Sequence, residues 1–392
     1  MIPRRIESYL IKDLSKKMVF LSGPRQCGKT TLVQKLCRKF NGIYYNWDHS
    51  EHRKNILTEK LNLDAPLWVF DELHKYRRWR NFLKGFFDTY RKSLKIIVTG
   101  SARLELYGRG GDSLQGRYFS HHLHPFTLGE LLKKPIIPIK EIPNLPNSAI
   151  QQSELENLLI LGGFPEPYLS GSQKEASRWR LGYSHRLVEE EVRSLEQVIE
   201  LDRIELLYYR LSAIVGSTLS INSLREDLEV AFESVRNWLN IFDRLDVIFR
   251  LSPYGPPKIK SVKKEQKLYL WDWAQVENEG ARFENFIAFH LLRWIHWCQD
   301  MEGEHIDFRY FKARTGQEVD FIILYQGKPY MAIEVKLKTD DLSPNIRYLV
   351  ERLDIPYAFQ VFLKDSQEKR FQNIGKTIIR NISAARMLAN LP

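Results

Sequence analysis

A run of small and polar residues near the N-terminus has the spacing of a phosphate-binding loop. Residues 23–30 read GPRQCGKT, so two glycines separated by four residues are followed by Lys29 and Thr30. The backbone N–H groups of such a loop point toward an anion, and the following helix adds the partial positive charge of its N-terminus. The lysine can reach the β- and γ-phosphates and the threonine can bind Mg²⁺, which predicts a site for ATP and Mg²⁺. The residues expected to line it are Gly23, Pro24, Arg25, Gln26, Cys27, Gly28, Lys29, Thr30 and Thr31.

Two carboxylates end the apolar segment at residues 67–72, which reads LWVFDE. This pattern is typical of a Walker B element, in which Asp71 holds the Mg²⁺ ion, usually through water. Glu72 would then orient and polarise the attacking water, and it is the expected catalytic residue of ATP hydrolysis. The alternative is a strand that simply stops at polar residues.

A third apolar segment, at residues 95–101, reads KIIVTGS and also ends in small polar residues. Ser101 is expected beside the γ-phosphate, and Thr99 is the less favoured choice. The alternative is an ordinary strand end, because strands commonly end in such turns without any ligand.

A second group of ionisable residues lies near the C-terminus. Residues 318–338 read EVDFIILYQGKPYMAIEVKLK, two apolar strands on either side of the turn 326–329. A hairpin centred on Gly327 brings Asp320 opposite Glu334 on one face, where directly opposed Cβ atoms lie roughly 5 Å apart. Opposed carboxylates repel each other unless a cation lies between them, and their oxygens suit Mg²⁺ or Mn²⁺.

The same hairpin places Glu318 opposite Lys336. The alternative to a metal site is therefore a solvated strand face that carries an ordinary cross-strand ion pair, as exposed strands often do.

The elements that must position these groups follow from the apolar pattern. Short apolar strands alternate with helical segments from the N-terminus onward, which indicates an α/β domain with a parallel sheet. The expected strands lie at about 18–22, 43–47, 67–71 and 95–100, with a fifth at 118–123. Residues 133–147 contain four prolines and read as a linker, so we expect this first domain to end near residue 150.

The middle of the chain has the pattern of a winged helix. A helix start at Ser220 precedes a second helix at about 234–245 and an apolar wing strand at 247–251. One hypothesis puts Arg236 and its neighbours on the second helix in a DNA groove. The acidic residues on that helix favour the alternative, a module that packs between domains.

The composition narrows the class of protein. The chain has 392 residues and a net charge of +11, and residues 1–150 carry +14 of charge while the remainder carries −3. A basic excess of this kind gives mild support to a nucleic-acid partner. No run of about 18 apolar residues occurs, and the three cysteines lack metal or disulfide spacing, so we expect a cytoplasmic protein.

Several segments together resemble a known family. GPRQCGKTTL, VFDELHKYRRW, VTGSARLELYGRGGDSLQGRY and HPFTLGEL are similar to AAA-type ATP-binding proteins of bacteria and archaea whose C-terminal half is an uncharacterised family domain. The motif LGGFPE at 161–166 and the hairpin 318–338 also fit. The resemblance covers most of the chain. It implies a P-loop AAA-type domain (1–150), a helical linker with a winged helix (151–257) and a restriction-endonuclease-like α/β domain of the PD-(D/E)xK type (258–392).

The resemblance also implies roles for the C-terminal residues. Asp320 and Glu334 would bind the metal, and Lys336 would be the catalytic lysine that positions or deprotonates water. Glu284, in the segment ARFENF, matches the helix carboxylate that often completes such a site. A nuclease fold that binds DNA without cutting it is the third possibility.

A further implication concerns Arg117, in the segment SLQGR. By resemblance it would act in trans on the ATP of a neighbouring subunit, with Arg103 and Arg109 as rivals and a structural ion pair as the alternative. We therefore expect a hexameric homo-oligomer that hydrolyses ATP and acts on DNA. The competing hypothesis is a nucleotide-dependent switch whose C-terminal domain binds a partner or DNA without cleavage.

Overall fold

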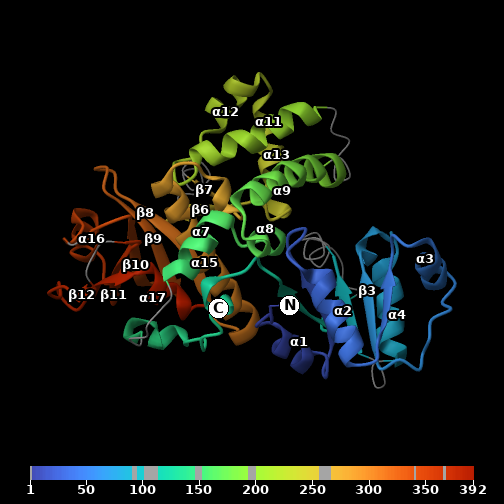
Figure 1. Ribbon diagram of the computed structural model, residues 1–392. Helices are drawn as coiled ribbons and strands as arrows, with labels where there is room; N and C mark the ends of the chain where they lie inside the picture. The colour runs from blue at the N-terminus through green and yellow to red at the C-terminus, as the bar shows by residue number, and fades with distance from the viewer. Residues whose placement is uncertain are drawn as a thin grey trace. The chain divides into compact units, whose positions relative to one another are not determined.

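The computed structural model describes residues 2–90, 95–100, 114–145, 152–192, 200–255, 266–339, 341–364 and 368–392 (Figure 1). The chain forms two compact units. Unit 1 contains Met1–Pro125 together with Arg244–Asp246, and unit 2 contains Phe126–Asp243 together with Val247–Pro392. Within the described residues, no helix is both long and apolar enough to cross a membrane.

Unit 1 is built on a five-stranded sheet in the order β2-β3-β4-β1-β5, in which every neighbouring pair is parallel. Its strands are β1 (Met18–Ser22), β2 (Ile43–Asn46), β3 (Leu67–Asp71), β4 (Lys95–Thr99) and β5 (Tyr118–His122). The five expected strands are confirmed, each within one residue at its ends. Every residue of β1 and β3 is buried, as in parallel sheets that are covered on both faces.

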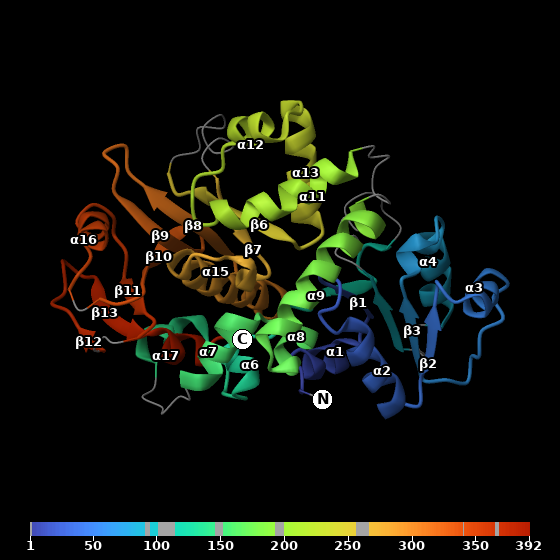
Figure 2. The same cartoon turned by 45° about the horizontal axis from the view of Figure 1, so that its top comes forward.

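Helices cover the two faces of this sheet. They are α1 (Glu7–Asp13), α2 (Lys29–Lys39), α3 (Ser50–Leu57) and α4 (Trp79–Tyr90). Figure 2 shows α1 and α2 on one side and α4 on the other. Trp79, Leu83 and Phe86 of α4 pack against Phe20 and Phe70 of the sheet. This aromatic core fixes the strand ends that carry the predicted phosphate-binding residues.

Unit 2 begins earlier than the expected domain boundary near residue 150. The backbone N–H of Phe126 donates to the carbonyl of Gly163, and that of Leu128 donates to Nε2 of His290 at 3.1 Å. These bonds tie the segment after β5 to unit 2. The chain therefore divides at 125/126, before the proline-rich stretch that was expected to be the linker.

The helices of unit 2 differ widely in length. They are α6 (Leu128–Leu131), α7 (Gln152–Leu161), α8 (Pro165–Ser170), α9 (Gln173–Arg186), α11 (Leu201–Leu211), α12 (Ile221–Leu228), α13 (Phe232–Arg244), α15 (Glu279–Trp297), α16 (Pro344–Val350) and α17 (Ala384–Ala389). The hydroxyl of Ser220 caps α12 by accepting from the N–H of Ser223, at the helix start that the sequence indicates.

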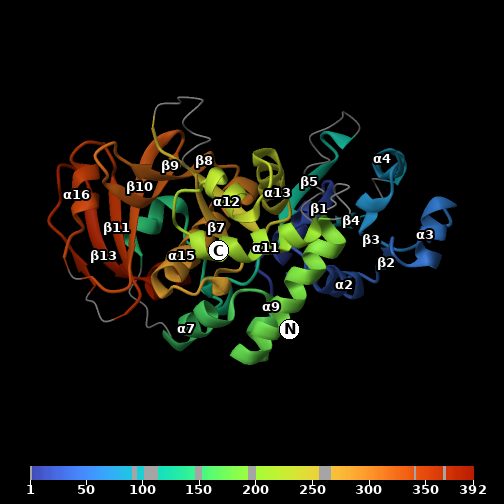
Figure 3. The ribbon, with the colours of Figure 1, turned by 90° about the horizontal axis from the view of Figure 1, so that it is seen from above.

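The strands of unit 2 form one eight-stranded sheet in the order β12-β13-β11-β10-β9-β8-β6-β7. They are β6 (Ile248–Pro253), β7 (Lys267–Leu270), β8 (Ile306–Lys312), β9 (Glu318–Tyr325), β10 (Lys328–Lys336), β11 (Tyr357–Phe362), β12 (Lys369–Arg370) and β13 (Ile378–Ser383). Helices α15 and α16 lie on either side of it (Figure 3).

The strand that was expected to be the wing belongs to this large sheet. β6 pairs with β7 in an antiparallel hairpin and with β8 in parallel, through Ser252 and Arg309. The middle and C-terminal segments therefore share hydrogen bonds within one unit, whereas the sequence predicted separate domains that meet at 257/258. That junction lies outside the described residues.

The β9–β10 hairpin turns in two residues. Gln326 and Gly327 both have positive φ, 51° and 76°, as this tight turn requires, and Tyr325 pairs with Lys328. The register then shifts once, between Pro329 and Met331. This bulge gives β10 one extra residue relative to β9.

Candidate nucleotide site and C-terminal carboxylate cluster

The phosphate-binding loop has the strand–loop–helix form that the sequence predicts. It joins the end of β1 at Ser22 to the start of α2 at Lys29. Gly28 has φ of 97°, a left-handed conformation that favours glycine. Gly23 packs so closely on the chain that a Cβ there would meet the carbonyl oxygen of Leu123 at 2.3 Å. Both glycines are therefore required by the loop's shape.

The side chain of Lys29 folds back onto this loop. Its Nζ donates to the carbonyl oxygens of Gly23 and Pro24, at 2.8 and 2.7 Å, and the residue is buried. The ammonium group is thus held at the mouth of the loop by two neutral acceptors. A bound phosphate would offer charged oxygens instead, which are the stronger partners.

Asp71 at the end of β3 accepts hydrogen bonds from three different elements. Thr30 of α2 donates from Oγ1 to Oδ2 at 3.0 Å. The hydroxyl of Tyr44 on β2 donates to Oδ2, and that of Thr99 on β4 donates to Oδ1. The two side chains that would bind Mg²⁺, Thr30 and Asp71, are thus in direct contact, and their hard oxygens suit that ion.

Two of these contacts bear on the sequence predictions. Ser101, the expected γ-phosphate contact, lies outside the described residues, and the less favoured Thr99 contacts Asp71. Tyr44 was missed, since no motif marks it. Burial and the hydrogen bond to Asp71 raise the pKa of its hydroxyl, so it stays a neutral donor. Its only sequence signal is its position on the strand beside Asp71.

Glu72, the predicted catalytic carboxylate, follows Asp71 in a left-handed conformation with φ of 57°. Its Oε2 lies 3.4 Å from Nζ of Lys75 and 3.8 Å from Nε2 of His74. Lys75 also binds Oδ2 of Asp48 at 2.6 Å. The carboxylate is therefore held at the edge of the site by a cation that it shares with Asp48.

Arg117 pairs with an acidic residue of its own unit. Its Nε and Nη2 donate to the two carboxylate oxygens of Asp88 on α4, at 2.8 and 3.0 Å. This bidentate geometry is the strong form of an arginine–carboxylate contact. The rivals Arg103 and Arg109 lie outside the described residues.

The register of the C-terminal hairpin follows the prediction beyond its bulge. Met331 pairs with Ile323 and Ile333 with Phe321, so the next residues along the two strands are Glu334 and Asp320. Asp320 accepts from the backbone N–H of the residue after Glu334, Val335, at 2.7 Å.

The lysine of this hairpin contacts a different carboxylate from the one expected. Nζ of Lys336 lies 2.9 Å from Oε1 of Glu334, a neighbour on the same strand. Glu318 instead contacts Lys267 at 2.5 Å and Lys312 at 3.8 Å. The cross-strand ion pair of Glu318 with Lys336, which was the alternative to a metal site, is therefore not formed: Glu318 pairs with lysines of other strands, and Lys336 pairs with Glu334.

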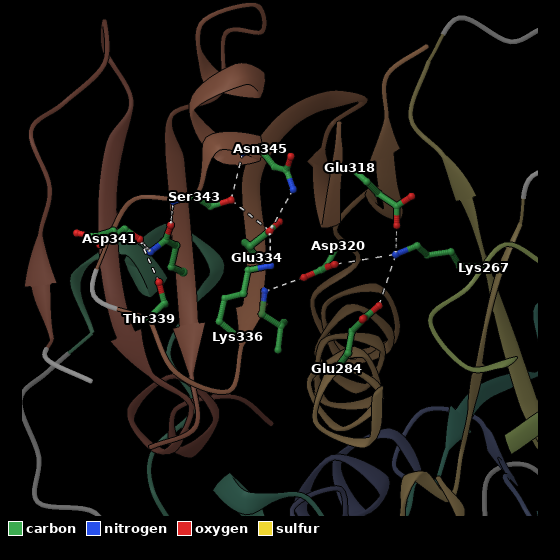
Figure 4. Close-up of polar contacts among 12 residues, drawn as sticks. Lys267, Glu284, Glu318, Asp320, Glu334, Lys336, Thr339, Asp341, Ser343 and Asn345 are labelled. Atoms are coloured by element: carbon green, nitrogen blue, oxygen red, sulfur yellow. Dashed lines mark hydrogen bonds and ion pairs between the residues drawn. The ribbon is translucent and has the colours of Figure 1, made fainter. Parts of the chain in front are cut away.

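Lys267 on β7 lies at the centre of the carboxylates (Figure 4). Its Nζ is 2.5 Å from Glu318, 3.5 Å from Glu284 and 4.0 Å from Asp320. Only 2% of the residue is exposed. Sequence reasoning missed Lys267, because no motif links the strand that carries it to the hairpin about 50 residues later.

The electrostatics of the cluster reflect this burial. Burial and the charges of Glu284 and Glu334 raise the pKa of Asp320 well above its usual range. Burial also raises the pKa of Glu284. For Lys267, burial acts to lower the pKa, but the surrounding carboxylates outweigh it and raise the pKa above the ordinary value. The lysine is therefore charged at neutral pH.

As they stand, these side chains do not fit a metal site. The described residues contain no group of three or more His, Cys, Asp or Glu side chains placed to hold an ion. Glu334 Oε1 contacts Lys336 and the hydroxyl of Ser343, and one oxygen of Asp320 accepts a hydrogen bond from the backbone N–H of Val335. The positive charge among Glu284, Glu318 and Asp320 is an ammonium group of the chain itself.

Three protein-family models match parts of the chain. An AAA domain matches residues 15–132, and two domains of unknown function, DUF8612 and DUF4143, match residues 152–276 and 279–381. The AAA match spans the phosphate-binding loop and the Asp71–Glu72 pair. Unit 1 therefore contains a P-loop ATPase domain, which implies that it binds a nucleotide, usually with Mg²⁺.

The chain is also similar to proteins of archaea and bacteria. It is 23% identical over 386 residues to an uncharacterized protein of Methanocaldococcus jannaschii, covering 86% of this chain and 78% of that protein. It is 21% identical over 348 residues to an uncharacterized protein of Mycobacterium tuberculosis, covering 84% and 73%.

Two solved structures give weaker matches. The Aeropyrum pernix ORC1 protein in complex with DNA matches 73% of this chain and 94% of that chain, with 15% identity and a TM-score of 0.34. A signal transduction ATPase with numerous domains from Pyrococcus horikoshii, which has a tetratricopeptide repeat sensor, matches 74% and 45%, with 15% identity and a TM-score of 0.23.

Proposed function

We propose that this protein is an oligomeric ATPase that couples ATP hydrolysis to the binding of DNA, and that its C-terminal segment recognises DNA or a partner without cutting it. The observation that carries the proposal is the convergence of Lys29, Thr30 and Asp71 at one edge of the parallel sheet. These side chains come from a loop, a helix and a strand, and each has the chemistry that a nucleotide triphosphate requires.

The roles of the side chains follow from their positions. Lys29 would exchange its two carbonyl partners for phosphate oxygens. Thr30 and Asp71 would hold Mg²⁺, which neutralises charge on the phosphates. Tyr44 and Thr99 keep the Asp71 carboxylate oriented by donating to it. Glu72 would accept a hydrogen bond from the attacking water, for which its carboxylate must remain ionised.

DNA binding is supported by the groove between α12, α13 and the β6–β7 hairpin. The groove has a volume of about 610 Å³, and its lining is rich in amides and guanidinium groups. The polar lining residues are Ser220, Asn222, Arg236, Asn240, Arg250 and Gln266. Such groups bind phosphates and base edges.

The cations of this groove have acidic neighbours. Arg236 pairs with Glu233 at 2.6 Å, and Arg250 pairs with Asp243 at 3.1 Å. Arg236 and Glu233 are both exposed, and an exposed ion pair contributes only about 1 kcal/mol or less. A DNA phosphate can therefore compete with Glu233 for Arg236 at little cost in free energy.

The C-terminal cluster supports recognition over cleavage. Asp320, Glu334 and Lys336 gather on the hairpin as a metal-dependent nuclease would need, but Lys267 already supplies the positive charge beside Asp320. Cleavage can be tested with Mn²⁺ and ATP on duplex, branched and single-stranded DNA. We expect all of these substrates to stay intact, and cutting that Asp320→Ala removes would overturn the non-cleaving role.

The ATPase proposal is tested by turnover of the full-length protein with and without DNA. We expect Mg²⁺-dependent hydrolysis of ATP whose rate changes when DNA is added. A protein that binds no ATP would overturn the proposal at its first step. If no form of DNA binds the protein or changes its rate of ATP hydrolysis, the coupling to DNA is overturned.

A further inference from the structure

We infer that Lys267 is a built-in counter-cation, which takes the place of a metal ion among Glu284, Glu318 and Asp320. It makes the C-terminal cluster a fixed, metal-free charge network. This role rests on the proposed non-cleaving function of the C-terminal segment, and it explains why that segment would not cut DNA.

The geometry places the ammonium group where the carboxylates converge. Nζ of Lys267 is within 4.0 Å of an oxygen of each of the three acidic side chains, which come from α15 and β9 (Figure 4). The ammonium group contacts Glu318 directly at 2.5 Å and attracts the two more distant carboxylates by charge. One side chain therefore supplies positive charge next to all three acidic side chains, and so lessens their mutual repulsion.

The surroundings of Lys267 fix it in this position. The ring of Tyr310 lies 5.4 Å from its Nζ, within the range of a cation–π contact. The hydroxyl of Tyr269, two residues along the same strand, donates to Oε1 of Glu284 at 2.8 Å. Gly216 closes the other side, because a Cβ there would lie 3.1 Å from both oxygens of Glu284.

The remaining carboxylate of the cluster has a cation of its own. Glu334 is 1% exposed and contacts Lys336 at 2.9 Å. Two lysines from two different strands thus supply positive charge beside the four acidic side chains of the cluster. An ammonium group has no open coordination position, so it cannot activate a water molecule as a bound metal does.

Mn²⁺ binding by the full-length protein tests this inference directly. The measurement uses nucleotide-free protein with Asp71→Asn in unit 1, so that the phosphate-binding site loses its carboxylate ligand. Mn²⁺ is followed by electron paramagnetic resonance and calorimetry. We expect no Mn²⁺ site in this background. Lys267→Met, which removes the charge but keeps most of the length of the side chain, should create one, and adding Asp320→Ala should abolish it again.

Two matched variants make the result specific. Lys267→Arg keeps a positive charge and should gain no Mn²⁺ site. Lys312→Met removes a half-exposed lysine that also contacts Glu318, at 3.8 Å, and it should gain none either. If Lys267→Met lowers the melting temperature, Mn²⁺ should raise it again, because the ion then takes over the lost charge.

Two outcomes would overturn the inference. The first is Mn²⁺ binding by the Asp71→Asn protein that is lost when Asp320→Ala is added. This outcome can be observed without any Lys267 variant. The second is a folded Lys267→Met protein that binds no Mn²⁺ and is not stabilised by it. DNA cleavage is a separate readout. Asp320-dependent Mn²⁺ binding without cleavage would refute only the role of Lys267 and leave the proposed function standing. Cleavage would refute the non-cleaving function itself.

Discussion

The hydroxyl of Thr30 donates a hydrogen bond of 3.0 Å to the carboxylate of Asp71. The first residue lies in the first turn of the helix after the phosphate-binding loop, and the second ends a strand 41 residues later. Their contact means that the two oxygen donors expected to share Mg²⁺ are already neighbours. Nucleotide binding then requires a change of partners at the site and no large movement of the backbone.

Lys29→Ala should abolish tight binding of ATP. The side chain is the buried cation of the loop, and alanine leaves both carbonyl acceptors and the phosphates without it. Binding of a fluorescent ATP analogue is the measurement. The control is Lys35→Ala on the same helix, which breaks only an ion pair with Glu7. Equal affinity in Lys29→Ala and the native protein would contradict the assignment.

Glu72→Gln should keep ATP bound but reduce turnover by roughly 10²–10⁴-fold, the range for loss of a general base. The amide cannot take a proton from water, although it fills the same space. Steady-state hydrolysis and ATP affinity are measured in parallel, with the exposed Glu51→Gln as the control. Unchanged turnover would remove Glu72 from the mechanism.

Arg117→Ala should reduce turnover by about 10³-fold if the arginine acts on a neighbouring subunit. Mixing these subunits with Lys29→Ala subunits should then restore part of the activity. The pair with Asp88 offers a sharp control, because a purely structural role predicts that Asp88→Ala costs as much as Arg117→Ala. Intact oligomers with no rescue on mixing would count against action in trans.

Arg236→Ala should weaken DNA binding and lower the slope of log affinity against log salt by about one. The effect should be similar for all DNA sequences, because the expected contact is a phosphate. Fluorescence anisotropy at several salt concentrations measures both quantities. Arg210→Ala is the matched control, since Arg210 is also exposed and pairs with Asp227 at 3.0 Å. Equal losses in both variants would indicate only a general charge effect.

Unit 2 should lose stability as the pH falls from 6.5 toward 4. Burial lowers the pKa of His290 to about 4, while an unfolded chain titrates near 6.5. The unfolded state therefore binds the proton first, so stability is present above pH 6.5 and is lost as the pH falls, by up to roughly 3 kcal/mol. Urea unfolding at a series of pH values measures the loss.

The variant His290→Gln provides the control for this effect. Glutamine can accept from the N–H of Leu128, as Nε2 of the histidine does at 3.1 Å, but it does not titrate. Its stability should vary less over the same pH window. An equal decline in both proteins would assign the pH dependence to other groups.

Local patterns predicted much of unit 1. The five strands and the loop between β1 and α2 follow from continuous apolar runs that end in glycines or carboxylates, and these signals are contained in short windows of sequence. The contact of Tyr44 with Asp71 was not predictable in the same way, because it depends on which strands become neighbours in the sheet.

The C-terminal cluster shows the same limit more strongly. The pairing of Phe321 with Ile333 followed from the position of Gly327 alone, although the turn proved shorter than expected and a bulge compensates for it. Lys267 lies more than 50 positions from Glu318 in sequence, on a strand for which the sequence predicted no role in the site. The pairing of β6 with β8 brings the two together, and no local pattern encodes that long-range contact.

The bulge between Pro329 and Met331 affects which insertions and deletions the gene for this protein can tolerate. If the pairing at the turn continued without it, Val319 would lie opposite Glu334, and Asp320 would face the other side of the sheet. A single-codon deletion in this short stretch would therefore remove the extra residue and leave Glu334 opposite Asp320 in an unbulged hairpin, whereas an insertion would add a second extra residue to β10. Among homologues, single-residue deletions should therefore be tolerated here better than insertions.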